Sequence, residues 1–173
     1  IMTTATYKRM VFDDANIINF NGLPGLFPNT KVVELAPALG VSPDATAFAQ
    51  RYLHALGFTT EIVEDRVGLV TPRILSMLIN EAAFCVMESV ASPADIDTAM
   101  KLGTNYPKGP LEWADEIGID VITDLMEGLK LEYAQERYRT CSLLKQYTRS
   151  GRTGKKAGKG FYSYDTKGNR AEI

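Results

Sequence analysis

Residues 70–91, VTPRILSMLINEAAFCVMESVA, decide the fold that this sequence predicts. Apolar residues recur there at three- and four-residue steps, which places them on one wide face of a long helix. That face consists of Ile74, Leu75, Leu78, Ile79, Ala82, Ala83, Val86, Met87 and Val90. Pro72 suits the first turn, where a helix has no internal partner for the missing N–H. Polar and charged residues interrupt the run too often for a membrane span, so we expect the central helix of a helical bundle.

Further helices are predicted downstream, because capping residues and prolines start them and glycines end several of them. We expect them from Ser92 to Gly103, from Pro110 to Gly118, from Asp120 to about Arg139 and from Ser142 to about Arg149. The predicted buried stripe of the third is Ile122, Leu125, Met126, Leu129 and Tyr133. From about residue 66 onward the sequence therefore predicts helices and loops alone.

The first third of the chain has a different pattern, in which short apolar runs alternate with one helix. The strand candidates are residues 15–20 (ANIINF), 31–36 (KVVELA) and 59–63 (TTEIV). Between the last two, Ser42 and Pro43 start a helix that Gly57 ends. This alternation is typical of an α/β sheet. We expect the boundary between the α/β part and the helical part near residues 65–68.

Length and composition are those of an ordinary globular protein, with 173 residues, 45% hydrophobic residues and a net charge of −2. So small a net charge indicates no charged partner, and we expect binding neither to nucleic acid nor to a membrane. The two cysteines lie in or beside predicted helices and no signal sequence is visible, so we expect free thiols and a cytoplasmic protein. Positive charge is concentrated in residues 142–164, which contain no acidic residue. The basic residues of this segment are Lys145, Arg149, Arg152, Lys155, Lys156 and Lys159.

Residue patterns that carry catalysis or bind metal are scarce. His54, the one histidine, lies in the middle of a predicted helix, and we interpret it as a partly exposed helix residue. No spacing of Cys, His and carboxylates is typical of a metal site, so no metal is expected. No GxGxxG sequence is present. Residues 154–160 (GKKAGKG) do not qualify as a P-loop, because they follow no strand and no Ser or Thr follows the lysines.

Three features leave alternatives open. Residues 154–160 form either a solvated basic segment or one in which Lys155 or Lys156 meets a phosphate. Glu34 lies within an apolar strand, so its carboxylate either faces water or has a specific partner. The loop 106–110 is stiff because two prolines fix φ, and it either only connects helices or forms the wall of a pocket.

The ordered motifs of this sequence resemble the carboxy-terminal part of the 3-hydroxyacyl-CoA dehydrogenase family. The matching stretches are residues 31–37 (KVVELAP), 64–75 (EDRVGLVTPRIL), 79–120 and 154–165 (GKKAGKGFYSYD). The sequence DIDTAMKLG, followed by YPKGP and far downstream by the last stretch, is specific as a set. The resemblance covers most of residues 20–165.

The resemblance implies both an architecture and an activity. Residues 1–66 would be the C-terminal portion of a Rossmann-type NAD-binding domain, and residues 67–173 a mainly α-helical bundle like the C-terminal domain of 6-phosphogluconate dehydrogenase. Proteins of this family oxidise the 3-hydroxyl of an acyl-CoA thioester with NAD, and their helical domain binds acyl-CoA and forms a homodimer. The family's dinucleotide fingerprint and catalytic serine would lie upstream. We therefore expect the chain to be one piece of a longer parent, inactive by itself.

The resemblance also assigns site residues one by one. Glu34 matches the glutamate that orients the family's catalytic histidine, but the histidine position, twelve residues earlier, is Gly22. The family's asparagine at the start of the long helix is replaced by Pro72. Lys156 matches a lysine that contacts NAD from the helical side. The stiff loop matches the loop facing the substrate cleft, through Tyr106, Pro107, Gly109 and Pro110.

This combination of matching and missing site residues leads to two possible functions. The first is an NAD-dependent oxidoreductase whose proton-transfer apparatus is altered, because Glu34 cannot take the hydroxyl proton in place of an imidazole. The second is a catalytically silent module for dimerisation or acyl-CoA binding, which the loss at Gly22 and Pro72 favours. In either case the wide apolar face predicts a homodimer, since short neighbouring helices leave part of it uncovered.

Overall fold

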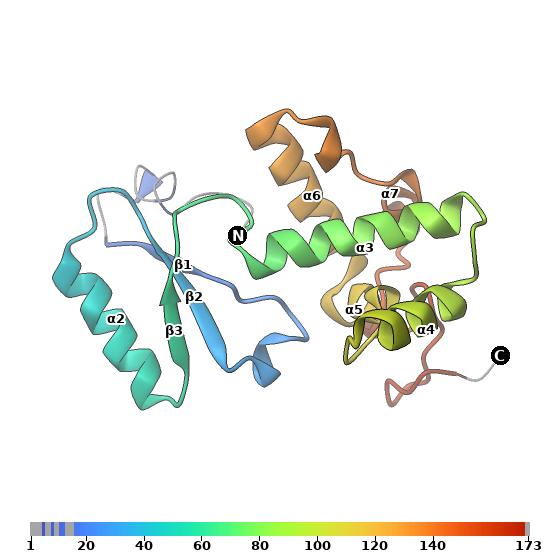
Figure 1. Cartoon of the computed structure of the whole chain (residues 1–173), viewed down its shortest axis with the longest axis horizontal. Coiled ribbons are helices and arrows are strands. Elements are labelled where there is room, and N and C mark those ends of the chain that lie inside the picture. Colours follow the sequence, from blue (N-terminus) through green and yellow to red (C-terminus); the bar gives the residue numbers. More distant parts are fainter. Residues whose placement is uncertain (1–4, 6–7, 9–10, 13–15, 172–173) are drawn as a thin grey trace. The chain divides into compact units, whose positions relative to one another are not determined.

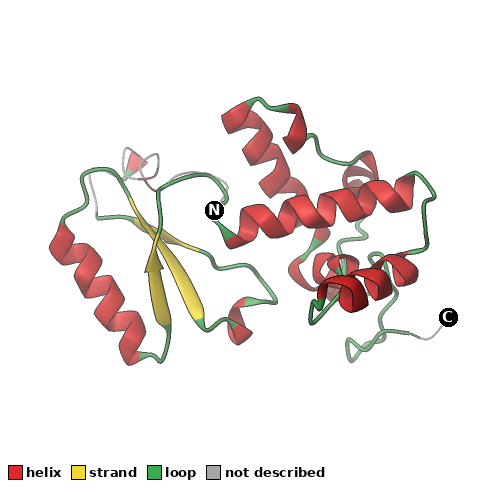
Figure 2. Ribbon diagram, in the orientation of Figure 1, coloured by secondary structure: helices red, strands yellow, loops and turns green. Residues whose placement is uncertain are grey.

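The computed structural model describes residues 5, 8, 11–12 and 16–171. The chain divides into two compact units, Ile1–Arg73 and Ile74–Ile173. Figure 1 labels the helices and strands, and Figure 2 shows that the strands belong to the first unit and that helices dominate the second. A mainly helical fold with a small sheet is thereby confirmed.

The first unit contains a three-stranded sheet in the order β1-β2-β3. Strand β1 (Ile18–Phe20) is antiparallel to β2 (Val32–Pro37), and β2 is parallel to β3 (Thr59–Ile62). A short 3-10 helix, η1 (Phe27–Asn29), lies between β1 and β2. Helix α2 (Pro43–Ala55) provides the crossover that a parallel pair requires, and it lies beside the sheet in Figure 1.

These elements lie where the strand and helix patterns predicted them. Ser42 caps α2 as expected, because its Oγ accepts a hydrogen bond from the Ala45 N–H at 3.2 Å. The first strand begins at Ile18 rather than at Ala15, and Ala15 lies outside the described residues. His54 is an exposed residue of α2, and its ring nitrogen lies 3.0 Å from the Thr60 hydroxyl.

The second unit is a bundle whose elements follow one another closely along the chain. They are the long helix α3 (Thr71–Met87), which starts at the end of the first unit, then α4 (Pro93–Thr104), α5 (Pro110–Ile117), α6 (Ile119–Tyr133), η2 (Glu136–Tyr138), α7 (Ser142–Arg149) and η3 (Lys155–Ala157). Helices α3 and α6 supply much of the core, with Ile79, Ala83, Ile122, Leu125, Met126 and Leu129 almost fully buried. The Asn80 side chain joins α3 to the segment before α7, since it accepts from the Cys141 N–H and donates to the Arg139 carbonyl.

Two helices end earlier than the sequence predicts. Helix α3 ends at Met87 instead of near Ala91, because Ser89 adopts a left-handed backbone (φ 60°) and the Val90 N–H returns to the Cys85 carbonyl. Helix α6 ends at Tyr133 instead of near Arg139, since Ala134 is left-handed as well (φ 51°). Neither residue is a glycine, so no stop signal marks these positions.

The cap predicted for α6 is also wrong. Gly118, with a φ of 112°, is the N-cap residue, and Asp120 lies inside the first turn. There its carboxylate is near the positive end of the helix dipole, where an acidic residue is favourable. The stripe predicted for this helix is buried from Ile122 to Leu129, whereas Tyr133 is only partly buried.

Candidate functional site

Glu34 is buried on β2, with 6% of its surface exposed, and its carboxylate has specific partners. Oε2 accepts the Val70 N–H at 2.9 Å, and Oε1 accepts the Thr71 N–H at 2.9 Å. The Thr71 hydroxyl donates a further short hydrogen bond to Oε1. Of the two possibilities for Glu34, exposure is thus wrong and a specific partner is right.

These contacts make Glu34 a cap for α3. The helix starts at Thr71, and the first N–H groups of a helix have no acceptor within it. A carboxylate at that end is favourable because it accepts these N–H groups and faces the positive end of the helix dipole. Glu34 therefore fixes the start of α3 to the sheet of the first unit.

The position that sequence counting assigns to the family histidine lies just past β1. The Gly22 N–H donates to the Phe20 carbonyl, and a Cβ at Gly22 would lie 2.7 Å from the Phe20 ring. On β1 itself, Asn19 is the register partner of Ala36 on β2. Glu34 lies two residues before Ala36, and residues two apart on a strand point to the same face, so Asn19 and Glu34 share a face of the sheet. The Asn21 Oδ1 accepts the backbone N–H of Glu34 at 3.0 Å.

Two buried asparagines thus lie around Glu34, and sequence reasoning missed both. Asn19 is 5% exposed and Asn21 is 8% exposed. The Asn19 Oδ1 accepts a hydrogen bond from the Lys8 ammonium at 2.8 Å. A possible signal was the alternation of amides with apolar residues in the first strand, since a buried amide requires a partner.

Pro72 occupies the first turn of α3 and is buried. It has no N–H to offer to Glu34, so the carboxylate contacts the N–H groups of the two residues before it. Pro72 thus fits the local backbone without a lost hydrogen bond. That it stands in the place of the family asparagine stays a prediction.

Replacing Glu34 by glutamine is expected to lower the free energy of unfolding by about 2 kcal/mol. The NH₂ group of the glutamine would face a backbone N–H that then lacks an acceptor. Glu61→Gln is the matched control, since Glu61 is the register partner of Glu34 on β3 and is exposed. Denaturant titration of both variants measures the difference. Equal losses in the two variants would contradict a capping role for Glu34.

In the second unit, the loop 106–110 is anchored by a buried carboxylate. Asp97 of α4, 1% exposed, accepts the Leu111 N–H at 2.8 Å and the Glu112 N–H at 3.0 Å, which are the first free donors of α5. A Cβ at Gly109 would lie 2.1 Å from the Asp97 Cγ, so only glycine permits this approach.

The other predicted residues of this loop lie close by. Pro110 is buried as the first residue of α5, and Tyr106 and Pro107 are exposed. The Tyr106 ring packs against Trp113 of α5 at 5.4 Å between centroids.

A second buried carboxylate holds the C-terminal segment. Asp115 of α5, 1% exposed, accepts the Phe161 N–H at 2.8 Å, the Tyr162 N–H at 2.9 Å and the Tyr164 hydroxyl at 3.0 Å. The Tyr162 hydroxyl donates to Asp97 at 2.6 Å and so links the two carboxylates. We call Asp97, Asp115, Tyr162 and Tyr164 the tail clamp.

Burial changes the acid–base properties of the tail clamp. Desolvation raises the pKa of both Asp97 and Asp115, although the hydrogen bonds that each accepts lower it. Desolvation and the adjacent carboxylates raise the pKa of both tyrosines, so their hydroxyls remain donors. Sequence reasoning missed both aspartates, although each occupies a position that helical spacing marks as inward-facing.

Lys155 and Lys156 lie on η3, in the segment that the tail clamp holds, and both are exposed. Among residues 5, 8, 11–12 and 16–171, no cluster of three His, Cys, Asp or Glu side chains is arranged to hold a metal ion. In the same part of the chain, no helix has the length and apolarity to cross a membrane. Cys85 and Cys141 are free thiols, as expected.

Comparison with known proteins identifies the family to which these helices belong. The family described as "3-hydroxyacyl-CoA dehydrogenase, C-terminal domain" matches residues 68–164, which is more than half of the chain. The chain belongs to the 3-hydroxyacyl-CoA dehydrogenase family. The family resemblance seen in the sequence is thereby confirmed.

Individual members of the 3-hydroxyacyl-CoA dehydrogenase family agree with this. A probable 3-hydroxybutyryl-CoA dehydrogenase of Bacillus subtilis is 42% identical over 140 residues, which cover 81% of this chain and 49% of that protein. A 3-hydroxyadipyl-CoA dehydrogenase of Escherichia coli is 48% identical over 117 residues, covering 67% of this chain and 24% of that protein. The crystal structure of (S)-3-hydroxybutyryl-CoA dehydrogenase from Ralstonia eutropha superposes with a TM-score of 0.83 at 35% identity, covering 94% of this chain and 58% of that one.

The chain spans about half the length of the Bacillus subtilis protein and a smaller share of the Escherichia coli protein. Residues 68–164 contain both carboxylates of the tail clamp and the loop 106–110. Glu34, Gly22 and the asparagines around them lie outside this segment. The helical domain of a 3-hydroxyacyl-CoA dehydrogenase is therefore the part of the family that the match supports directly.

Proposed function

We propose that the chain is part of an oxidoreductase that oxidises 3-hydroxyacyl-CoA thioesters with NAD, as in fatty-acid metabolism. Residues 67–173 would supply the acyl-CoA side of the cleft, and residues 1–66 the end of the NAD-binding domain. The observation that supports this most strongly is the family match over residues 68–164. Within this segment, the buried carboxylates of the tail clamp hold the start of α5, next to the loop 106–110, and the C-terminal segment.

The residues at hand fit only part of an NAD site. The exposed ammonium of Lys156 suits a contact with a phosphate of the dinucleotide, as the resemblance implies. No glycine-rich turn between a strand and a helix occurs in residues 16–171, so the main dinucleotide site would belong to the rest of the parent. NAD, when bound, accepts the hydride. We accordingly expect residues 1–173 alone to be inactive.

Glu34 favours a second candidate function, a catalytically silent module for dimerisation or acyl-CoA binding. Its carboxylate accepts three hydrogen bonds at the start of α3, and the neighbouring side chains on its sheet face include amides rather than an imidazole. An amide does not take a proton from a hydroxyl at neutral pH. The two candidates therefore differ in whether another group of the parent takes that proton.

The test of the proposed function is NADH formation by the full-length parent from 3-hydroxybutyryl-CoA and longer 3-hydroxyacyl-CoA thioesters. Turnover is expected, because the chain matches the helical domain of the family. The absence of NADH with every chain length would exclude the oxidoreductase and leave the silent module.

Substitutions in the same parent separate the two candidates further. The pair Gly22→His and Pro72→Asn restores the residues that sequence counting assigns to the family, and Asn19→His places an imidazole on the sheet face of Glu34. An active parent is expected to lose activity with Gly22→His, since the new side chain meets the Phe20 ring. Activity that arises only after substitution would favour the silent module.

We also propose a homodimer in the cytoplasm. Helix α3 still carries exposed apolar residues in this structure, with Ile74 at 64% and Met87 at 41%. These two belong to the face predicted to need a second copy of the chain. Light scattering is expected to give twice the monomer mass at micromolar concentration, and a monomer mass would exclude the dimer.

A further inference from the structure

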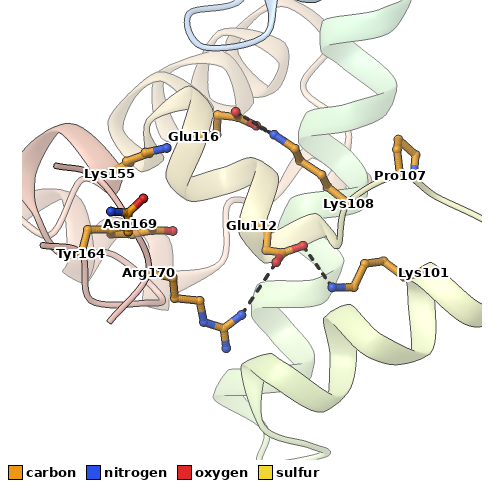
Figure 3. A pocket seen from close by; sticks show the side chains of 10 residues that line it. Lys101, Pro107, Lys108, Glu112, Glu116, Lys155, Tyr164, Asn169 and Arg170 are labelled. Carbon is orange, nitrogen blue, oxygen red and sulfur yellow. Dashed lines mark hydrogen bonds and ion pairs between the residues drawn. The ribbon is translucent and has the colours of Figure 1, made fainter. Parts of the chain in front are cut away.

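A polar pocket in the second unit lies beside the tail clamp. It encloses about 440 Å³ between the loop 106–110, helix α5 and the C-terminal segment. Figure 3 shows the side chains that line it. Its charged residues are Lys101, Lys108, Lys155, Arg170, Glu112 and Glu116.

Positive charge exceeds negative charge in this lining by two. Glu112 pairs with Lys101 at 3.4 Å and with Arg170 at 3.7 Å, and Glu116 pairs with Lys108 at 2.6 Å. Among the described residues, Lys155 has no carboxylate within ion-pair distance, and in Figure 3 it lies across the pocket from Lys108 and Lys101. Asp97 and Asp115 lie behind the pocket wall, and each already accepts three hydrogen bonds from N–H or hydroxyl groups.

The cations of the pocket are partly fixed before any ligand arrives. The Arg170 guanidinium lies 3.6 Å from the centroid of the Tyr162 ring, and Tyr162 belongs to the tail clamp. The stem of Lys155 packs so close to Gly168 that a Cβ there would lie 2.9 Å from the Lys155 Cε. Such contacts reduce the side-chain freedom that binding would otherwise remove.

Lys155 also belongs to a second hollow, which adjoins the first. That hollow contains Lys156 and Lys167, and it shares Lys155, Tyr164 and Gly168 with the first pocket. The segment GKKAGKG therefore places the Lys155 ammonium, which has no ion-pair partner among the described residues, between two polar depressions.

We propose that the pocket binds a phosphate-bearing anion, such as a diphosphate group, with Lys155 and Arg170 as its main ligands. The negative charge of a diphosphate would balance the excess positive charge of the lining. Its oxygens are the acceptors that guanidinium and ammonium groups prefer. The ion pairs of Glu112 and Glu116 join partly exposed groups, which contribute little free energy, so the anion can draw Lys101 and Lys108 toward itself. The proposal does not depend on the oxidoreductase activity.

Calorimetric titration of the chain with inorganic pyrophosphate at low ionic strength tests this. Binding is expected to weaken roughly tenfold in Lys155→Gln and in Arg170→Gln, and to weaken as salt is added. Lys145→Gln is the matched control, since it removes the same charge on α7, where Lys145 pairs with Glu127 at 2.6 Å. Glu116→Gln is expected to tighten binding roughly threefold, because it releases Lys108. Circular dichroism verifies that each variant is folded.

Two results would overturn the proposal. One is the absence of measurable pyrophosphate binding by the unaltered chain, and the other is an equal effect of Lys155→Gln and Lys145→Gln. A parallel titration with coenzyme A identifies the source of the phosphate. If Lys155→Gln weakens coenzyme A binding tenfold, the pocket binds the phosphates of the substrate, an assignment that rests on the proposed function. If the variant weakens pyrophosphate binding alone, the pocket binds a free anion. Failure of the parent to form NADH would leave the pyrophosphate result unchanged.

Discussion

Gly154→Ala is expected to lower the free energy of unfolding by about 4 kcal/mol, the largest effect of any single methyl group considered for this chain. Gly154 has a φ of 111° and a ψ of −151°, a backbone region that is open essentially to glycine alone. A Cβ there would also lie 2.4 Å from the carbonyl oxygen of Asp115. Because that oxygen belongs to the main chain of α5, a side-chain rotation cannot relieve the overlap.

Gly151→Ala separates the clash from the backbone strain. Gly151 also has a positive φ, 73°, but a Cβ there would meet nothing within 4 Å. Its replacement is expected to lower the free energy of unfolding by only about 1 kcal/mol, the usual penalty of the left-handed conformation. Chemical denaturation of both variants provides the comparison. Equal losses would show that the C-terminal segment does not lie against α5 as described.

Asp115→Asn is expected to lower the free energy of unfolding by about 3 kcal/mol at neutral pH, because one of the two carboxylate oxygens that accept from two N–H groups and one hydroxyl is lost. Asparagine offers one acceptor oxygen, and its NH₂ group would face buried donors. Asp124→Asn is the control, since Asp124 lies exposed on α6. A loss in Asp115→Asn no larger than in Asp124→Asn would refute the tail clamp.

The pH dependence of this loss has a definite sign. Desolvation raises the pKa of Asp115 in the folded protein above its ordinary value of 3.8. A group whose pKa is raised on folding contributes stability below its unfolded pKa, and that contribution falls as pH rises through the folded pKa. The advantage of the unaltered chain over Asp115→Asn is therefore expected to be largest below about pH 4 and to decrease toward neutral pH. Denaturation of both proteins across this range measures it, and an advantage that increases with pH would contradict the direction of the shift.

Local signals in the sequence predicted the elements well where the chain supplies its own punctuation. Ser42 and Ser92 each precede a proline, and both cap helices in the structure through their hydroxyls. The ends of α3 and α6 could not be predicted, because Ser89 and Ala134 become left-handed only in the folded context. Residue identity alone does not indicate that conformation outside glycine and asparagine.

The candidate site was harder to predict, because its contacts are distant in sequence. Glu34 meets Val70 and Thr71 across 36 and 37 residues, and Asp115 meets Tyr162 across 47. The apolar strand marked Glu34 as a residue that needs a partner, but periodicity does not say which one. For the same reason, counting twelve residues back from Glu34 indicated Gly22, whereas strand pairing places Asn19 on the same sheet face as Glu34.

As proposed, the protein to which this chain belongs removes a hydride from the 3-position of a 3-hydroxyacyl-CoA. Incubation of the full-length parent with NAD and 3-hydroxybutyryl-CoA deuterated at carbon 3, followed by mass spectrometry of the nicotinamide product, measures that transfer directly. NADH that carries one deuterium is expected. Recovery of the deuterated substrate and of NAD, with no deuterated NADH, after prolonged incubation with the folded full-length protein would contradict the proposed function.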